Sequence, residues 1–102
     1  MYNNKITISV VVPTFNDAEP LKKLLEKLLQ QSILPSETII IDSSNNDEIK
    51  KLIDNFNSYD LKIIYHRILP SFAGKSINVG VKLSNSDYIA FLDTKTIPDS
   101  DW

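Results

Sequence analysis

Short β-type and α-type segments alternate along this sequence, with only brief links between them. The expected strands are apolar and largely β-branched, and they cover residues 6–12, 37–41, 61–66 and 88–92. The expected helices repeat apolar residues at i, i+3 and i+4, and they cover residues 20–31, 47–56 and 75–83. Strands separated by helices pair in parallel through right-handed crossovers. The order therefore predicts one three-layer α/β/α domain with a mostly parallel sheet.

Prolines and short polar residues set the expected boundaries. Pro13 closes the first strand, and Asn16 or Asp17 is available to cap the first helix. Residues 71–74 are expected to form a loop. The segment after Asp93 also reads as loop, so we expect a truncated piece of a longer domain, with a short natural domain as the alternative.

Composition narrows the classes of partner and site. The 102 residues are 42% hydrophobic and 24% charged, which is typical of a single globular domain. A formal net charge of -2 gives no general attraction to nucleic acid, so no nucleic-acid partner is expected. With no cysteine and only one histidine, His66, zinc sites built on thiolates or paired histidines are excluded.

No leader or membrane segment is expected from this sequence. Residues 1–5 are polar, and the apolar runs are far shorter than the roughly 20 residues needed to cross a bilayer. The lack of cysteine fits a reducing compartment. We therefore expect a cytoplasmic protein, with the inner face of the membrane as an alternative location.

Polar residues gather at the carboxyl ends of the expected strands, where parallel α/β sheets bind ligands. These ends carry Asn16, Asp42 and Asp93. Such residues are also common in turns and helix caps, so any one end alone favours a structural role. The only glycines are Gly74 and Gly80, so the Gly-rich fingerprints of dinucleotide-binding enzymes and nucleoside triphosphatases are absent. This argues against hydride transfer and kinase chemistry.

Four ordered segments carry a more specific pattern. They read Pro13-Thr14-Phe15-Asn16, Glu37-Thr38-Ile39-Ile40-Ile41-Asp42, Gly74-Lys75-Ser76-Ile77-Asn78-Val79-Gly80 and Ser86-Asp87-Tyr88-Ile89-Ala90-Phe91-Leu92-Asp93. This series resembles the family 2 glycosyltransferases, and residues 98–102 resemble the short stretch that comes after the last segment in that family. The likeness covers nearly the whole chain. It implies that residues 1–102 are the nucleotide-sugar-binding half of a GT-A glycosyltransferase domain, which is a Rossmann-like fold.

The resemblance also implies roles for individual residues. Pro13, Thr14 and Asn16 would line the base and ribose pocket. Asp42 would accept hydrogen bonds from the nucleobase, a task that suits an ionised carboxylate. We expect Asp42 and Asp93 to face the same crevice at the carboxyl ends of the strands.

The third segment would lie near the ribose or the diphosphate, through Gly74, Lys75 and Asn78. Lys75 stands at the start of an expected helix, where its charge adds to the positive end of the helix dipole and favours an anion. A solvated lysine at a helix start is an equally weighted alternative.

The sequence departs from the family pattern in two places. Ser43 and Ser44 stand where the family has a second Asp and a Gly. Asp93 would be the first acid of the family's D-x-D motif, which holds the Mg²⁺ or Mn²⁺ ion that the family implies as cofactor. Lys95 replaces the second acid, and a protonated lysine cannot ligate a divalent cation. Asp93 is thus the one metal ligand that the motif retains, and metal binding of the usual kind is in doubt.

The resulting hypothesis is transfer of a sugar from a nucleoside-diphosphate sugar to a hydroxyl of a carbohydrate or lipid-linked acceptor, in polysaccharide biosynthesis and with inversion. The alternative, which Lys95 favours, is a non-catalytic nucleotide-binding or assembly domain without the metal site. In the family the catalytic base lies in the later half of the domain, so no catalytic residue is assigned and the chain is expected to be inactive alone. Self-association is also expected, through an apolar sheet edge or helix face left uncovered.

Overall fold

The computed structural model describes residues 6–56 and 60–95. The elements follow one another as β1 (Ile8–Thr14), α1 (Ala18–Leu29), β2 (Glu37–Asp42), α2 (Glu48–Asn55), β3 (Ile63–Arg67), the 3₁₀ helix η1 (Pro70–Lys75), α3 (Ser76–Leu83) and β4 (Tyr88–Phe91). The expected alternation is therefore confirmed. The resemblance at residues 98–102, with the acids Asp99 and Asp101, lies outside the described residues.

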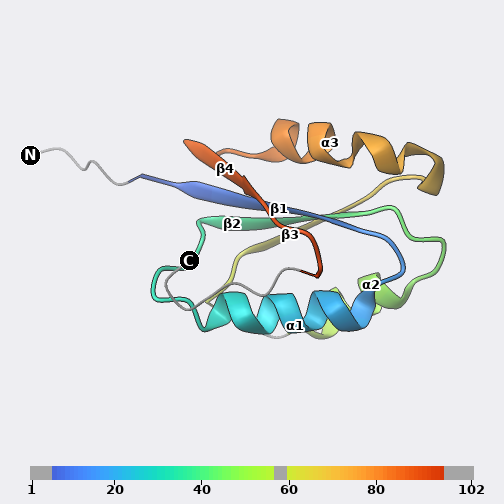
Figure 1. Ribbon diagram of the computed structural model, residues 1–102, viewed down its shortest axis with the longest axis horizontal. Helices are drawn as coiled ribbons and strands as arrows, with labels where there is room; N and C mark the ends of the chain where they lie inside the picture. Colours follow the sequence, from blue (N-terminus) through green and yellow to red (C-terminus); the bar gives the residue numbers. More distant parts are fainter. Residues whose placement is uncertain (1–5, 57–59, 96–102) are drawn as a thin grey trace, which may run out of the picture.

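The strands form one sheet in the order β3-β2-β1-β4, and every pairing in it is parallel. The central strand β1 pairs through Val11 with Ile39 of β2 and with Phe91 of β4. Helices α1 and α2 cover one face of this sheet and α3 covers the other (Figure 1). The predicted three-layer α/β/α arrangement is confirmed.

The core lies in two layers, one on each face of the sheet. The layer under α1 and α2 contains Val10, Val12, Leu21, Leu24, Leu25, Leu28, Ile40, Ile49, Leu61 and Leu92. The layer under α3 contains Val11, Ile39 and Ile41. Neighbouring strand residues point to opposite faces, so the β-branched runs of β1 and β2 supply both layers. Each fully buried aliphatic side chain contributes about 1.5–3 kcal/mol of transfer free energy, which makes these two strands the centre of stability.

Helix α3 lies unusually close to the sheet at Gly80. A Cβ atom built on Gly80 would lie 2.3 Å from Cγ1 of Val11. The lack of a side chain at this position therefore sets the separation between α3 and β1, and with it the height of α3 above the carboxyl end of the sheet.

The sequence predicts that the first strand ends before Pro13, whereas β1 continues through Pro13 to Thr14. The backbone N–H of Leu92 donates to the carbonyl of Val11, so alternate β1 residues, including Pro13, face β4. The last β1–β4 pair is Val11 with Phe91, so no β4 residue is paired opposite Pro13. Pro13 has no N–H to donate toward β4, but no pairing with β4 is lost at this position. Strand β1 can therefore continue to pair with β2.

Residues 71–74, expected as loop, belong to η1. This helix begins at Pro70, whose fixed φ suits a first helical position. It leads directly into α3, whose start at Ser76 is one residue after the expected start.

Polar side chains join the strands at the amino ends of the sheet. The Thr7 hydroxyl lies 3.3 Å from a carboxylate oxygen of Asp87, and the backbone N–H of Asp87 donates to the Thr7 hydroxyl at 2.9 Å. Buried Glu37 accepts hydrogen bonds from the Ser9 hydroxyl at 2.6 Å and from the backbone N–H of Asn85 at 2.8 Å. These contacts lie opposite the carboxyl ends, where ligands are expected.

The outer surfaces of β4 and α3 expose large apolar side chains. The exposed residues on these two elements are Ile77, Val81, Tyr88 and Phe91. None of the helices found within residues 6–56 and 60–95 is long and apolar enough to span a membrane.

Candidate functional site

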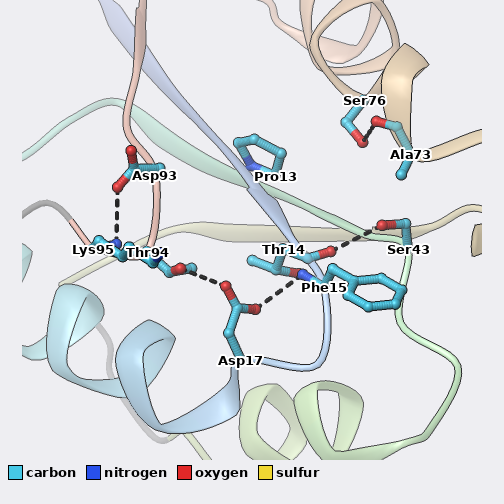
Figure 2. Close-up of a pocket in the computed structure, with 10 residues that line it drawn as sticks. All are labelled: Pro13, Thr14, Phe15, Asp17, Ser43, Ala73, Ser76, Asp93, Thr94 and Lys95. Atoms are coloured by element: carbon cyan, nitrogen blue, oxygen red, sulfur yellow. Dashed lines mark hydrogen bonds between the residues drawn. The ribbon is translucent and has the colours of Figure 1, made fainter.

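A cavity of about 340 Å³ opens at the carboxyl ends of β1, β2 and β4 (Figure 2). It is lined by Pro13, Thr14, Phe15, Asp17, Ser43, Ala73, Ser76, Asp93, Thr94 and Lys95. The volume falls within the range of small-molecule sites, and the location is where parallel α/β sheets bind ligands. Ala73 of η1 and Ser76, the first residue of α3, close one side of the cavity.

The wall between β1 and β2 is held by backbone contacts. Both the backbone N–H and the hydroxyl of Ser43 donate to the carbonyl oxygen of Thr14, at 3.0 and 3.1 Å. Both residues are buried. These two hydrogen bonds join the ends of β1 and β2 at the cavity wall.

Asn16 joins the turn after β1 to the turn after β2. Its backbone has φ 52°, a left-handed conformation that Asn tolerates better than most residues. Its backbone N–H donates to the Ser44 hydroxyl at 2.8 Å, and its side-chain amide exchanges hydrogen bonds with Asn45 at 2.9 and 3.2 Å. A further bond comes from the Asn46 amide at 3.2 Å. Asn16 is not among the residues that line the cavity.

Asp42 lies beneath the site and does not line it. Its side chain is fully buried, with one oxygen accepting the Ser44 backbone N–H at 2.9 Å and the other accepting the Tyr65 hydroxyl at 2.5 Å. Burial, together with this hydrogen bond to Asp42, raises the pKa of Tyr65 well above its ordinary value. The expectation that Asp42 and Asp93 face one crevice is therefore wrong, because only Asp93 lines the cavity.

Arg67, at the end of β3, holds the turn after β2 from outside. Its guanidinium contacts the Asp47 carboxylate at 2.5 Å and donates to the carbonyl oxygens of Ser44 at 3.2 Å and Asn46 at 2.6 Å. The hydrogen bond from Arg67 lowers the pKa of Asp47. The sequence offered one signal for this role, an arginine directly after an expected strand.

The turn after β4 contributes Asp93, Thr94 and Lys95 to the cavity wall. The Asp93 carboxylate accepts the backbone N–H of Lys95 at 2.9 Å. Thr94 is 8% exposed and donates its hydroxyl to the carboxylate of Asp17. The other oxygen of Asp17 accepts the backbone N–H of Phe15 at 3.0 Å, as Figure 2 shows. Asp17 occupies the N-cap position of α1 but makes no side-chain cap bond, contrary to expectation.

The carboxylates of Asp17 and Asp93 do not form a divalent metal site of the kind expected from the D-x-D motif. Within residues 6–56 and 60–95, no three His, Cys, Asp or Glu side chains gather closely enough to hold a metal ion. Asp17 and Asp93 already accept hydrogen bonds, and Lys95 brings a positive charge to the same wall. Mg²⁺ is commonly held by one or two carboxylates together with substrate phosphates and water, and Asp93 is the only acid of the D-x-D pair present here.

At the start of α3, Ser76 rather than Lys75 faces the cavity. The buried Ser76 hydroxyl donates to the carbonyl of Ala73 at 2.7 Å. The ammonium of Lys75 lies 5.3 Å from the ring centre of Phe72, in cation–π range. Asn78, two residues after Ser76 in α3, is exposed and does not line the cavity.

Comparison with known families gives this site its context. The sequence profile described as Glycosyl transferase family 2 matches residues 9–102. The chain belongs to this family. The family 2 chain is 29% identical over 91 residues to glycosyltransferase GlyG of Streptococcus pneumoniae, covering 88% of this chain and 30% of GlyG. It is 31% identical over 91 residues to the poly(ribitol-phosphate) beta-N-acetylglucosaminyltransferase TarP of Staphylococcus aureus, covering 85% and 28%.

Solved structures agree on the fold of this family 2 chain. The crystal structure of S. aureus TarS residues 1–349 in complex with UDP superposes with a TM-score of 0.78 at 22% identity, covering 94% of this chain and 29% of that one. A second TarS structure gives a TM-score of 0.73 at 23% identity, covering 94% and 18%. The GT-A fold expected from the sequence is thus confirmed. The chain spans less than a third of the length of these relatives.

The predicted site residues fall into two groups in the family 2 fold. Those that line the cavity are Pro13, Thr14, Asp93 and Lys95. Those that do not line it are Asn16, Asp42, Gly74, Lys75 and Asn78. The cavity residues that sequence reasoning did not assign are Phe15, Asp17, Ser43, Ala73, Ser76 and Thr94. Each of the six is adjacent in the sequence to a residue that the family resemblance assigned to the site. This adjacency was the signal that the sequence offered for them.

Proposed function

We propose that this chain binds the donor of a glycosyl-transfer reaction, a nucleoside-diphosphate sugar, in the cavity at the carboxyl ends of β1, β2 and β4. The observation that carries this proposal is Lys95, a cation on a cavity wall that also carries the hydroxyls of Thr14 and Ser43 and the carboxylates of Asp17 and Asp93. The Lys95 ammonium can donate to an anionic ligand, and the carboxylates of Asp17 and Asp93 can accept from ligand hydroxyls. The UDP bound in the related TarS structure makes UDP the natural first probe.

In this proposal Lys95 takes the place of the metal. Its ammonium would contact the diphosphate and stabilise the charge that develops as the sugar leaves. The N-terminal end of α3, near Ser76, adds the positive end of a helix dipole on the opposite wall. Donor binding would then require no Mg²⁺ or Mn²⁺.

The acceptor and the catalytic base remain unassigned among the described residues. By similarity to TarP, whose name specifies poly(ribitol-phosphate) and N-acetylglucosamine, we propose a carbohydrate or lipid-linked acceptor and a role in polysaccharide biosynthesis. General-base activation of the acceptor hydroxyl would complete the transfer. We place this reaction in the cytoplasm or at the inner face of the membrane.

A second candidate is a nucleotide-binding or assembly domain without transferase activity. The observation that favours it is again Lys95, which stands where the family holds a metal ligand. Both candidates predict nucleotide binding, but only the first predicts sugar transfer. A longer polypeptide that carries residues 1–102 and still binds UDP without transferring sugar would favour the second.

Calorimetric titration with UDP, UMP and uridine tests the donor site directly. If Lys95 contacts the diphosphate, affinity should rise with each added phosphate. Ala73→Phe should abolish UDP binding, because Ala73 lines the cavity and a phenyl ring there would fill it. Ser71→Phe is the matched control, since Ser71 is an exposed residue of the same helix η1 outside the cavity wall. Equal binding of UDP by both variants would contradict the proposed site.

A further inference from the structure

Asp17 occupies a cap position yet directs its carboxylate elsewhere. It stands at the N-cap of α1, where an Asp ordinarily accepts a backbone N–H of the first helical turn. Instead one oxygen accepts the N–H of Phe15, before the helix, and the other accepts the hydroxyl of Thr94, which is 77 residues away in the sequence. The carboxylate thus joins two loops that line the same cavity.

The bond to Thr94 controls more than one side chain. Thr94 is buried between two exposed residues, Asp93 and Lys95, which both line the cavity. The Lys95 N–H is itself bonded to the Asp93 carboxylate at 2.9 Å, so residues 93–95 form one closed turn. Fixing Thr94 therefore fixes the direction of the whole turn.

We propose that Asp17 is a positioning residue of the nucleotide pocket, which acts through Thr94 to hold Asp93 and Lys95 at a set distance from the turn at Phe15. This inference rests on the proposed donor site. Asp17 need not contact the ligand, because both of its oxygens already bind protein groups. Its effect is to hold Lys95 at the cavity wall before the nucleotide arrives, which lowers the cost of ordering the turn on binding.

The chain contains a matched control for the Asp17–Thr94 hydrogen bond. Thr7 and Asp87 form a second threonine–aspartate contact between the β1 and β4 segments, at the amino ends of these strands and away from the cavity. Loss of either contact should loosen the pairing of β1 with β4. Only the loss of the Asp17–Thr94 contact should change the site.

The experiment measures UDP affinity and urea stability for Thr94→Val, Thr94→Ser and Thr7→Val. We expect Thr94→Val to weaken UDP binding about tenfold, because it removes the hydroxyl while keeping the shape. Thr94→Ser should restore the affinity to within about twofold, and Thr7→Val should leave it unchanged even where it lowers stability as much. Adding Asp17→Ala to Thr94→Val should cause little further loss. Equal UDP affinities for Thr94→Val and Thr7→Val would overturn the positioning role.

Amide hydrogen exchange separates this inference from the donor site itself. If the wild-type chain binds no nucleoside diphosphate, the proposed function fails, and exchange at Asp93, Thr94 and Lys95 still tests the Asp17–Thr94 hydrogen bond. Faster exchange of these amides in Thr94→Val, but not in Thr7→Val, supports it. The same exchange in both variants would overturn it.

Discussion

The hydroxyl of Tyr65 donates a 2.5 Å hydrogen bond to the carboxylate of Asp42, which is fully buried at the carboxyl end of β2. The same carboxylate holds the backbone N–H of Ser44 at 2.9 Å. Asp42 thereby supports the turn that places Ser43 on the cavity wall. The family resemblance assigns Asp42 to the nucleobase. In this structure its carboxylate instead binds Ser44 and Tyr65 and supports the turn beside the cavity.

Tyr65→Phe should destabilise the fold by about 1–3 kcal/mol, because it leaves a buried carboxylate oxygen of Asp42 without its partner. Urea unfolding followed by circular dichroism measures this loss. Tyr88→Phe, at an exposed tyrosine of β4, is the control and should change stability by less than about 0.5 kcal/mol. Equal effects of the two substitutions would show that the Asp42 contact contributes nothing.

The same pair predicts an alkaline limit to stability. The pKa of Tyr65 is raised in the folded state, first by burial and then by Asp42. A raised pKa means that the stabilisation is fully present below the unfolded pKa of about 10 and is lost as pH rises through the folded value. The free energy of unfolding of the wild type should therefore fall more steeply above about pH 10 than that of Tyr65→Phe. Parallel curves would contradict the assignment.

Glu37 predicts the corresponding acid limit at the opposite end of the sheet. The Ser9 hydroxyl, and then the Asn85 backbone N–H, lower its pKa. Stabilisation from a lowered pKa is present above the unfolded value of about 4.3 and is lost as pH falls through the folded value. Glu37→Gln should cost about 1–3 kcal/mol at neutral pH, and the difference from wild type should shrink below about pH 4. Glu26→Gln, on the exposed face of α1, is the matched control and should change stability by less than about 0.5 kcal/mol at neutral pH.

Gly80→Ala should destabilise the chain by about 1–3 kcal/mol, because the added Cβ would lie 2.3 Å from Val11 and push α3 off the sheet. Gly74→Ala is the matched control, since a Cβ there has no neighbour within 4 Å. Thermal unfolding of the two variants compares them directly. A Gly80→Ala variant as stable as Gly74→Ala would show that α3 can move without cost.

The elements were predictable from the sequence because their signals are local. The β-branched runs and the leucine spacing of α1 report burial on a sheet and on a helix face, and both proved correct. The extension of β1 past Pro13 was not predictable, since it depends on where β4 ends. The contacts of Asp17 with Thr94 and of Asp42 with Tyr65 join residues 77 and 23 positions apart, so no local pattern reveals them.

Self-association remains a prediction of the exposed apolar surface on β4 and α3. Ile77, Val81, Tyr88 and Phe91 are all more than 40% exposed, and among residues 6–56 and 60–95 no strand pairs with the outer side of β4. Sedimentation velocity should show dimers or larger species that grow with concentration. Phe91→Lys, which places a charge on that edge, should return the chain to a monomer. A wild-type monomer at high concentration would contradict this prediction.

The central claim is that Lys95 replaces a metal ion at the donor diphosphate, and UDP titration in EDTA and in Mn²⁺ tests it most directly. The wild-type chain should bind UDP equally well in both. Lys95→Asp, which restores an acid two residues after Asp93, should bind UDP at least about tenfold more weakly in EDTA, because a charge-assisted hydrogen bond is lost, and should recover in Mn²⁺. Lys82→Asp, the same charge change on an exposed residue of α3, should behave as wild type. Binding of UDP by the wild type only when Mn²⁺ is present would contradict the claim.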